Sequence, residues 1–196
     1  SWLVFDKFTT LLIGLIVIVK VANHYGPTEY GLYQYAVSIN LLLGVIVLFI
    51  DGRVVKKLYP YGNEGLVIYN TTIAKVILSF ISLIIGILIL FVLGKGFKFN
   101  SIYLLLLITN IVINLAFGIQ SFFEYHLKSK NVVIASNIAN ISSAILQLIA
   151  VALNFSIVSI VAIILASSVL KLFILYFQFK MSFSLKIVTK LDTIFK

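Results

Sequence analysis

The sequence predicts an all-α, polytopic membrane protein built as a bundle of six transmembrane helices. Composition is the first reason: 62% of the 196 residues are hydrophobic and 11% are charged, with a mean hydropathy of +1.17. Soluble domains carry roughly 25% charged residues. Continuity is the second reason, because the apolar residues form unbroken stretches long enough for a helix to cross ~30 Å of hydrocarbon. The strict alternation of a membrane β-barrel is missing.

Six stretches have the required length. They cover residues 2–21, 31–50, 69–93, 101–122, 132–153 and 155–177. We expect them to form one membrane domain over residues 1–178, because only a helix pairs every backbone group within its own segment in lipid. In residues 179–196, apolar residues recur at helical spacing and lysines lie between them. This pattern indicates an amphipathic cytoplasmic linker on the membrane surface or a frayed end beside a further domain. The chain starts at Ser1 without a methionine, so we expect a fragment.

Basic residues predict the orientation. If the first helix starts in the cytoplasm, ten basic residues fall on the cytoplasmic side and two on the other. The ten are Lys7, Arg53, Lys56, Lys57, Lys128, Lys130, Lys180, Lys186, Lys190 and Lys196, and the two are Lys95 and Lys98. Loops rich in lysine and arginine stay in the cytoplasm, so both termini are expected there.

A tight turn at Gly26 and Pro27 joins the first two helices. Glycine adopts the left-handed conformation that ends a helix, and proline opens the next helix where no backbone donor is needed. Glu29 then falls in the first turn of the second helix, where the helix dipole favours an anion. A short turn at Asn154 joins the last two helices, so each pair is predicted to be antiparallel.

Polar side chains form a stripe on each of two helices. One stripe holds Asn110, Asn114, Gly118 and Ser121, and the other holds Asn137, Asn140, Ala144 and Gln147. Spacings of three and four place each set on one helix face. Because amides are costly in lipid, the stripes are expected to face other helices or a wet cavity. Helix–helix contact and a water-lined substrate path both fit.

Four basic residues lie in or beside the predicted helices. Lys20 is about 9 Å from its helix end by helical rise, so it either snorkels to the surface or faces a central cavity. Lys75 is nearer the cytoplasmic end of its helix, which favours snorkelling. Lys171 either reaches the boundary or lines a cavity. Arg53 and Asp51 form either an interfacial charge pair or a binding contact.

The sequence shows no carrier for covalent chemistry. It has no cysteine, which excludes disulfides and iron–sulfur clusters. Its two histidines, His24 and His126, are predicted on opposite sides of the membrane, so a shared metal site is not expected. No glycine-rich phosphate loop and no serine–histidine motif occurs. We therefore expect no catalytic residue, metal or cofactor, and we ascribe the charge of +9 to loops facing lipid rather than to nucleic-acid binding.

Three segments carry motifs in a characteristic order. Residues 22–36 read ANHYGPTEYGLYQYA, residues 51–58 read DGRVVKKL, and residues 120–128 read QSFFEYHLK. In this order and spacing they resemble the end of helix one, the exit of helix two and the exit of helix four in bacterial oligosaccharide flippases. These are polysaccharide biosynthesis membrane proteins of the multidrug/oligosaccharidyl-lipid/polysaccharide exporter superfamily.

The resemblance implies the first six-helix lobe of a two-lobe transporter in the bacterial inner membrane, used for O-antigen, lipopolysaccharide or capsule synthesis. Its substrate would be an oligosaccharide linked through pyrophosphate to a polyprenol, moved by alternating access. Its partner would be a C-terminal lobe or a second chain. Water around the sugar would be replaced by Asn110, Asn114, Asn137, Asn140 and Gln147. The phosphate charge would be offset by Lys20, Lys171 and Arg53. Asn23 stands where the family usually has an arginine. If that arginine contacts the lipid-linked phosphates, this chain either lacks the contact or makes it with Lys20 or His24.

Three other functions stay open. A drug or cation exporter of the same superfamily would favour an acidic cavity, whereas these helices hold almost no acid. A membrane-embedded glycosyl- or acyltransferase would need an acid or histidine base near a membrane face. A non-catalytic scaffold would use the polar stripes only to pack helices.

Overall fold

The computed structural model describes residues 2–61, 63–93 and 96–182, and this part of the chain contains helices and no strand. The elements are α1 (Trp2–Val47), α2 (Gly52–Leu58), the 3-10 helix η1 (Tyr59–Tyr61), α3 (Glu64–Leu93), α4 (Gly96–Leu115), α5 (Phe117–Tyr125), α6 (Ser129–Ala152) and α7 (Ile157–Ser182). The prediction of an all-α membrane bundle is confirmed.

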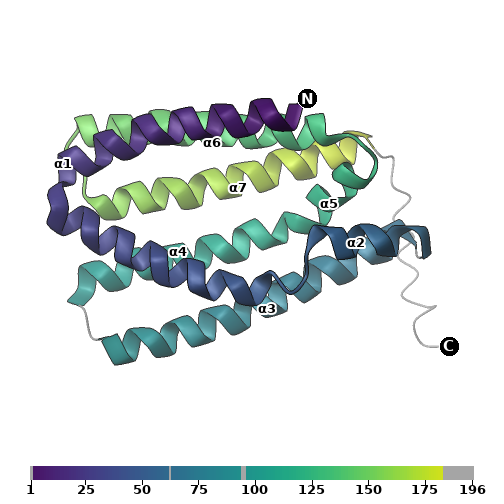
Figure 1. The fold of residues 1–196 in the computed structure, drawn as a ribbon, viewed down its shortest axis with the longest axis horizontal. Helices are drawn as coiled ribbons and strands as arrows, with labels where there is room; N and C mark the ends of the chain where they lie inside the picture. Colours follow the sequence, from purple (N-terminus) through teal and green to yellow (C-terminus); the bar gives the residue numbers. More distant parts are fainter. Residues whose placement is uncertain (1, 62, 94–95, 183–196) are drawn as a thin grey trace.

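The first helix, α1, consists of two helices joined at Gly26. Gly26 has a φ of +69° and a ψ of 177°, a positive-φ conformation that glycine adopts without steric cost. Pro27 then opens the second helix. In Figure 1, α1 runs away from the N-terminus, turns back and returns toward α2. We call residues 2–25 the first arm and residues 27–47 the second arm. We call the end of the bundle at this turn the hairpin end. The opposite end, where α2 lies, is the α2 end.

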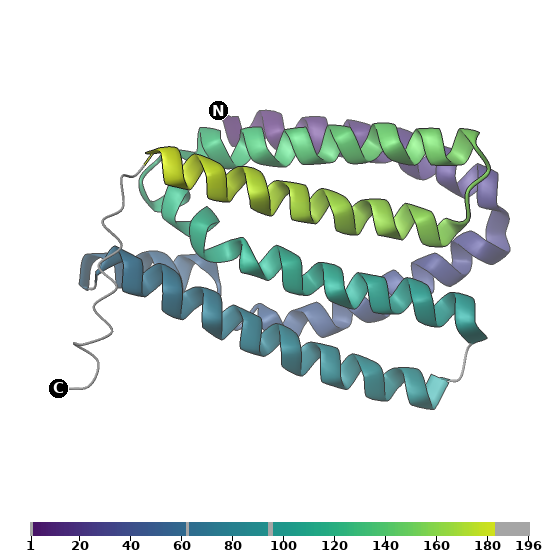
Figure 2. The ribbon, with the colours of Figure 1, turned by 180° about the vertical axis from the view of Figure 1, so that it is seen from behind.

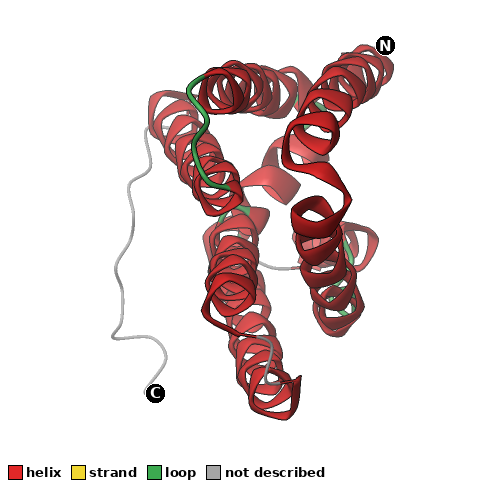
Figure 3. Cartoon of the chain, turned by 90° about the vertical axis from the view of Figure 1, so that its left-hand side faces the viewer, coloured by secondary structure: helices red, strands yellow, loops and turns green. Residues whose placement is uncertain are grey.

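The helices pack in the order first arm, α6, α7, α4, α3 and second arm. Figure 2 shows α7 between α6 and α4, with α3 beyond α4. Seen from the hairpin end in Figure 3, the described chain is helices joined by short loops. In addition to its neighbours in this order, α4 contacts the second arm, so α4 is the most enclosed helix of the bundle.

The largest apolar core lies between the second arm, α4 and α7. Phe99, Ile102 and Tyr103 of α4 are buried there against Ile157 and Val161 of α7. The rings of Phe99 and Tyr103 stack with centroids 5.9 Å apart. Because α7 is packed on α4 in this way, its other side is held in place beside α6 and the first arm.

Five described helical segments are long and apolar enough to cross a membrane. They are Thr10–Val47, Glu64–Leu93, Gly96–Tyr125, Ser129–Ala152 and Ile157–Met181. The first contains the Gly26 turn, so the five segments provide six passes. Large apolar side chains such as Leu42 and Phe91 are 73% and 82% exposed, which a bilayer accommodates and water does not. The chain is a multi-pass membrane protein.

Several helix boundaries differ from those predicted. α3 begins at Glu64 rather than residue 69, because the Oδ1 of Asn63 accepts a hydrogen bond from the N–H of Gly65 at 3.0 Å and caps the helix start. α4 begins at Gly96 rather than residue 101. α7 begins at Ile157 and runs to Ser182, so residues 179–182 continue this helix. The rest of the predicted linker, 183–196, lies outside the described residues.

The predicted helix over residues 101–122 is broken at Ala116. The N–H of Ala116 donates to the carbonyl of Ile113 at 3.2 Å, a tighter 3-10-type bond, and α5 starts at the next residue. Gly118 of α5 lies so close to α3 that a Cβ there would be 2.1 Å from the Oγ1 of Thr72. We infer that α5 changes direction at this break to pack against α3.

The start of α1 and the end of α7 lie at the same end of the bundle (Figure 1). This agrees with an even number of passes. The cytoplasmic location of that end stays a prediction. At the hairpin end, the hydroxyl of Tyr25 donates to the carbonyl of Phe155 at 2.6 Å, and Lys98 forms an ion pair with Glu29. These two contacts join the two sides of the Gly26 turn to the turn between α6 and α7 and to the start of α4.

Candidate functional site

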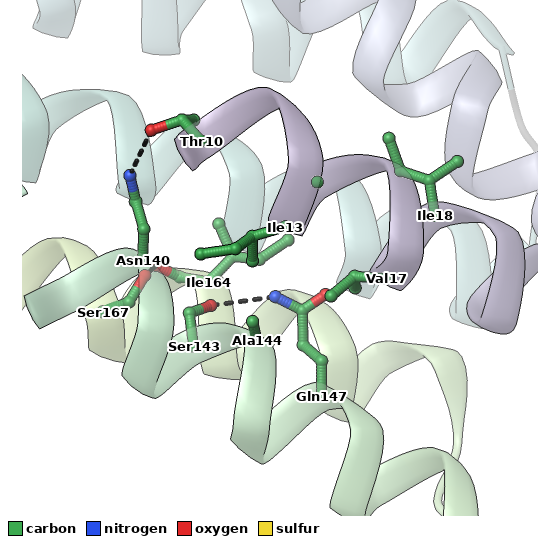
Figure 4. Close-up of a pocket in the computed structure, with 11 residues that line it drawn as sticks. Thr10, Ile13, Val17, Ile18, Asn140, Ser143, Ala144, Gln147, Ile164 and Ser167 are labelled. Atoms are coloured by element: carbon green, nitrogen blue, oxygen red, sulfur yellow. Dashed lines mark hydrogen bonds between the residues drawn. The ribbon is translucent and has the colours of Figure 1, made fainter. Parts of the chain in front are cut away.

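A cleft opens between the first arm, α6 and α7 (Figure 4). Its volume is about 250 Å³. The first arm contributes Thr10, Ile13, Gly14, Val17 and Ile18, α6 contributes Asn140, Ser143, Ala144 and Gln147, and α7 contributes Ile164 and Ser167. We call this space the α1/α6 cleft. It lies along helices that span the membrane, so its polar lining requires an explanation.

Helical spacing brings the polar residues of α6 to the cleft. Asn140, Ser143 and Gln147 are three and four residues apart and share one face. The Nδ2 of Asn140 donates to the Oγ1 of Thr10 at 3.3 Å, and the Nε2 of Gln147 donates to the Oγ of Ser143 at 2.8 Å. Each bond uses one hydrogen of an amide that carries two hydrogens and an acceptor oxygen. The cleft therefore offers uncharged donors and acceptors.

The first arm and α7 supply the remaining walls. A Cβ built on Gly14 would have no heavy atom within 4 Å, so the missing side chain leaves space at this depth. The hydroxyl of Ser167 donates to the backbone carbonyl of Ile164 at 2.8 Å, which satisfies the donor within its own helix. Its oxygen is left as an acceptor on the cleft wall.

Two lysines flank the cleft along the helix axes. Lys171 is half-buried and lies one turn beyond Ser167 toward the α2 end, on the same side of α7. Lys20 is exposed and lies three residues beyond Val17 toward the hairpin end. In the part of the chain with described side chains, the carboxylates lie at or near helix ends, on Glu29, Asp51, Glu64 and Glu124. Between those ends, no described side chain of the three helices that line the cleft carries a negative charge.

The stripe on α4 is separate from the cleft lining. The Nδ2 of Asn110 donates to the Oδ1 of Asn40 on the second arm at 2.8 Å. The Nδ2 of Asn114 donates to the backbone carbonyl of Asn110 at 2.8 Å. These bonds join α4 to the second arm, which is the helix–helix contact that the sequence left as one of two possibilities. Gly118 and Ser121 fall on α5, after the break.

Asn137 lies one turn before Asn140 on α6, toward the α2 end. Its Oδ1 is buried and has no hydrogen-bond partner among the described residues. A buried acceptor without a partner costs about 1–3 kcal/mol, and Asn137 is not among the residues that line the α1/α6 cleft. Arg53 belongs to α2, and its side chain lies outside the described part of the chain.

The snorkelling prediction for Lys75 is wrong. Lys75 is only 4% exposed, and its Nζ donates to the backbone carbonyl of Val47 at 2.9 Å. The same Nζ lies 4.2 Å from the ring centroid of Phe117. The side chain turns inward because the last carbonyls of the second arm lack partners within their own helix, and an ammonium is favoured at this end of the helix dipole.

Polar contacts also join the elements at the α2 end. The Nζ of Lys56 lies 2.9 Å from the Oε2 of Glu124, and the Nε2 of His126 lies 3.2 Å from the Oε1 of Glu64. Tyr59 in η1 is buried, and this burial raises the pKa of its hydroxyl above the usual value. The hydroxyl therefore stays protonated and uncharged. The hydroxyl of Tyr59 lies 3.4 Å from the Oγ of Ser121, so these contacts join α2 and η1 to α5, and the end of α5 to α3.

Sequence reasoning missed two members of the site, Thr10 and Ser143, which take part in the polar contacts of the cleft. It also missed Asn40, the partner of Asn110 outside the cleft. A single hydroxyl within an apolar helix forms no periodic pattern, so Thr10 left no signal. Ser143 did leave one, because it lies three residues after Asn140 on the predicted polar face of α6.

The comparison with protein families identifies the chain. The sequence model of a family described as "Polysaccharide biosynthesis protein" matches residues 1–196. The chain belongs to this polysaccharide biosynthesis family. No curated protein and no solved structure matches it. The resemblance of residues 22–36, 51–58 and 120–128 to polysaccharide biosynthesis membrane proteins is thereby confirmed at the level of the family. In this polysaccharide biosynthesis protein, the α1/α6 cleft is a polar site within the membrane-spanning helices.

Proposed function

We propose that this polysaccharide biosynthesis protein is one six-helix lobe of a bacterial flippase. It carries an oligosaccharide, linked through pyrophosphate to a polyprenol, across the cytoplasmic membrane. The observation that carries the proposal is the α1/α6 cleft, in which Asn140, Ser143 and Gln147 present uncharged hydrogen-bonding groups inside membrane-spanning helices.

A sugar that crosses hydrocarbon loses the water bound to its hydroxyls. In protein mutational data, each polar group buried without a partner costs about 1–3 kcal/mol. The amides of Asn140 and Gln147 donate and accept at once, so they replace water around hydroxyls of varied orientation. Asn137, one turn away on α6, holds a further buried acceptor that has no partner among the described residues.

The pyrophosphate poses a separate problem, because it is ionised. Lys171 and Lys20 lie on either side of the cleft along the helices, and Arg53 lies on α2 at the α2 end. Cations at these positions offset the phosphate charge while the polyprenyl tail stays in the bilayer. Among the described side chains, the carboxylates of the membrane-spanning helices lie at or near the ends of the helical passes. This disfavours a drug or cation exporter, because such a transporter needs an acidic cavity.

The proposal requires a second six-helix unit, either a C-terminal lobe or another chain. Two such units rocking about a shared cavity would expose the cleft to each side of the membrane in turn. The substrate crosses unchanged, so the function contains no covalent step and the protein is a transporter rather than an enzyme.

The test is to remove hydrogen bonding from the cleft in the intact protein. The Asn140→Leu/Gln147→Leu double variant is expected to lower surface polysaccharide about tenfold, since each lost hydrogen bond contributes about 0.5–1.5 kcal/mol. The lipid-linked oligosaccharide is expected to accumulate on the cytoplasmic side. Ile145→Ala is the control, because Ile145 is 53% exposed on the outer face of the same helix.

Normal export by the double variant at a normal membrane level would overturn the proposal. Loss of polysaccharide without accumulation of the lipid-linked oligosaccharide would also count against it, because that pattern points to a transferase that builds the oligosaccharide.

A further inference from the structure

A polar strip runs along the second arm near the hairpin end. Tyr30, Gln34 and Ser38 are four residues apart and follow one helix face; we call them the Tyr30 strip. The Nε2 of Gln34 donates to the hydroxyl of Tyr30 at 2.6 Å, and the Oγ of Ser38 donates to the backbone carbonyl of Gln34 at 2.8 Å. Tyr30 and Gln34 are half-buried, and Ser38 is exposed.

The Tyr30 strip is deep enough in the membrane to need a reason. Gln34 and Ser38 lie eight and twelve residues from Gly26, about 12 and 18 Å along a helix that rises 1.5 Å per residue. An amide that faced lipid at this depth would be costly. The strip is therefore expected to face a partner helix or a wet path.

The packing of Tyr30 connects the strip to the α1/α6 cleft. Its ring packs against the apolar cluster of Val17, Val21 and Ala144. Val17 and Ala144 also line the cleft. Tyr30 therefore reaches from the second arm to the hairpin end of the cleft, where it packs on apolar residues that the cleft lining shares.

The chemistry of the strip fits an uncharged, hydroxyl-rich ligand. Within the described chain, the Oε1 of Gln34 and the second hydrogen of its Nε2 have no protein partner, and the hydroxyl of Tyr30 keeps its own hydrogen to donate. The nearest carboxylate in sequence, Glu29, is paired with Lys98.

We propose that the Tyr30 strip is a second carbohydrate-binding subsite, which holds an uncharged sugar of the transported oligosaccharide nearer the hairpin end than the α1/α6 cleft does. The inference rests on the proposed flippase function. Thr10 of the cleft lies sixteen residues from Gly26 and Tyr30 of the strip lies four, about 24 and 6 Å by helical rise. The strip therefore extends the polar contacts toward the hairpin end, and the two subsites overlap in depth at Gly14 and Ser38, which are both twelve residues from Gly26.

The absence of cysteine from the chain permits a direct test. Ser38→Cys and Gln34→Cys are each placed in the intact protein, freed of any other cysteine, and open membrane sheets are treated with a charged methanethiosulfonate reagent. Membranes come from cells that make the lipid-linked oligosaccharide and from cells blocked at its first assembly step. We expect both variants to react in blocked membranes and to react severalfold more slowly when the oligosaccharide is present.

Ile84→Cys on α3 is the matched control. Ile84 lies at a similar distance from the hairpin end and is 57% exposed on an apolar helix face, so it is expected to face lipid and to stay unreactive in both membranes. Ser38→Cys preserves the size of the side chain and keeps the test valid if Gln34→Cys disturbs folding.

Two results would overturn the subsite. No reaction in either membrane would show that the strip faces lipid or a helix. Equal reaction in both membranes would show a wet surface that sugar does not occupy. Deletion of the gene separates this inference from the proposed function. If deletion abolishes export but the oligosaccharide does not protect the strip cysteines, the subsite alone is rejected. If export stays normal after deletion, both the subsite and the proposed function are rejected.

Discussion

The ammonium of Lys75 donates to the backbone carbonyl of Val47 across 2.9 Å, at the point where the second arm ends. It also lies above the ring of Phe117, 4.2 Å from the centroid. One side chain on α3 thus contacts the last turn of α1 and the first residue of α5. We infer that Lys75 fixes the relative position of these three elements at the α2 end of the bundle.

Lys75→Met is therefore expected to lower the free energy of unfolding by about 2 kcal/mol. The variant keeps the aliphatic stem but removes a charged hydrogen bond, which contributes about 1.5–3 kcal/mol. Chemical unfolding in detergent measures the effect. Lys57→Met on the exposed face of α2 is the control and is expected to change stability by less than about 0.5 kcal/mol. Equal stability of the two variants would contradict the role of Lys75.

No residue pattern reveals the contact of Lys75. Its partner is a backbone carbonyl 28 residues away, and every residue has such a carbonyl. The break at Ala116 was missed for a similar reason, because alanine is a strong helix former and the close approach of Gly118 to Thr72 is a tertiary contact. Both errors arise where packing between distant segments overrides local preference.

Local chemistry was sufficient elsewhere. The Gly26 turn was predicted because only glycine adopts its conformation freely and Pro27 fits the following position. The cleft face of α6 was predicted in part, because Asn140 and Gln147 follow helical periodicity. The Tyr30 strip was not predicted from the sequence, because tyrosines near a helix end are also explained by a position at the membrane interface.

Asn40 and Asn110 are expected to act as helix–helix contact rather than as a sugar site. Single Asn→Ala changes at either position remove the 2.8 Å bond between α4 and the second arm. A double-mutant cycle is expected to give a coupling near 0.6 kcal/mol, the average for side-chain hydrogen bonds between membrane helices, and surface polysaccharide should stay near normal. A cycle without coupling, or a loss of export in correctly inserted protein, would instead place Asn110 on the substrate path.

Gly118→Ala is expected to destabilise the bundle. A Cβ at this position would lie 2.1 Å from the Oγ1 of Thr72 and 2.8 Å from the carbonyl of Ile68, and overpacking of this kind costs about 1–3 kcal/mol. Adding Thr72→Ala should restore only part of the loss, because the carbonyl of Ile68 remains. Gly44→Ala is the control, since a Cβ there meets no atom within 4 Å and alanine favours the helix. Thermal unfolding that ranks the two alanine variants equally would contradict the close approach.

Lys171→Leu is expected to lower export about tenfold if Lys171 offsets the phosphate charge, since a hydrogen bond to a charged group contributes about 1.5–3 kcal/mol. Lys171→Arg should keep most of the activity because it keeps the charge. Lys180→Leu, exposed at the end of α7, controls for loss of a basic residue at the membrane boundary. Surface polysaccharide, normalised to the amount of protein in the membrane, is the measurement. Normal export by Lys171→Leu would remove this lysine from the site.

Gly14→Leu tests whether export needs the open space of the α1/α6 cleft, without changing the hydrogen-bonding groups of the cleft. The space beside Gly14 is open, and leucine favours a helix more than glycine does by up to about 1 kcal/mol, so the variant is expected to be at least as stable as the parent. Its side chain would occupy part of a cleft of about 250 Å³ without altering any hydrogen-bonding group. We therefore expect export to fall sharply while the protein stays folded, and Gly14→Ala to have a small effect. Gly44→Leu makes the same change in open space outside the cleft and should export normally. If Gly14→Leu exports as well as Gly44→Leu does, oligosaccharide does not pass through the α1/α6 cleft, whatever the polar residues there contribute to packing.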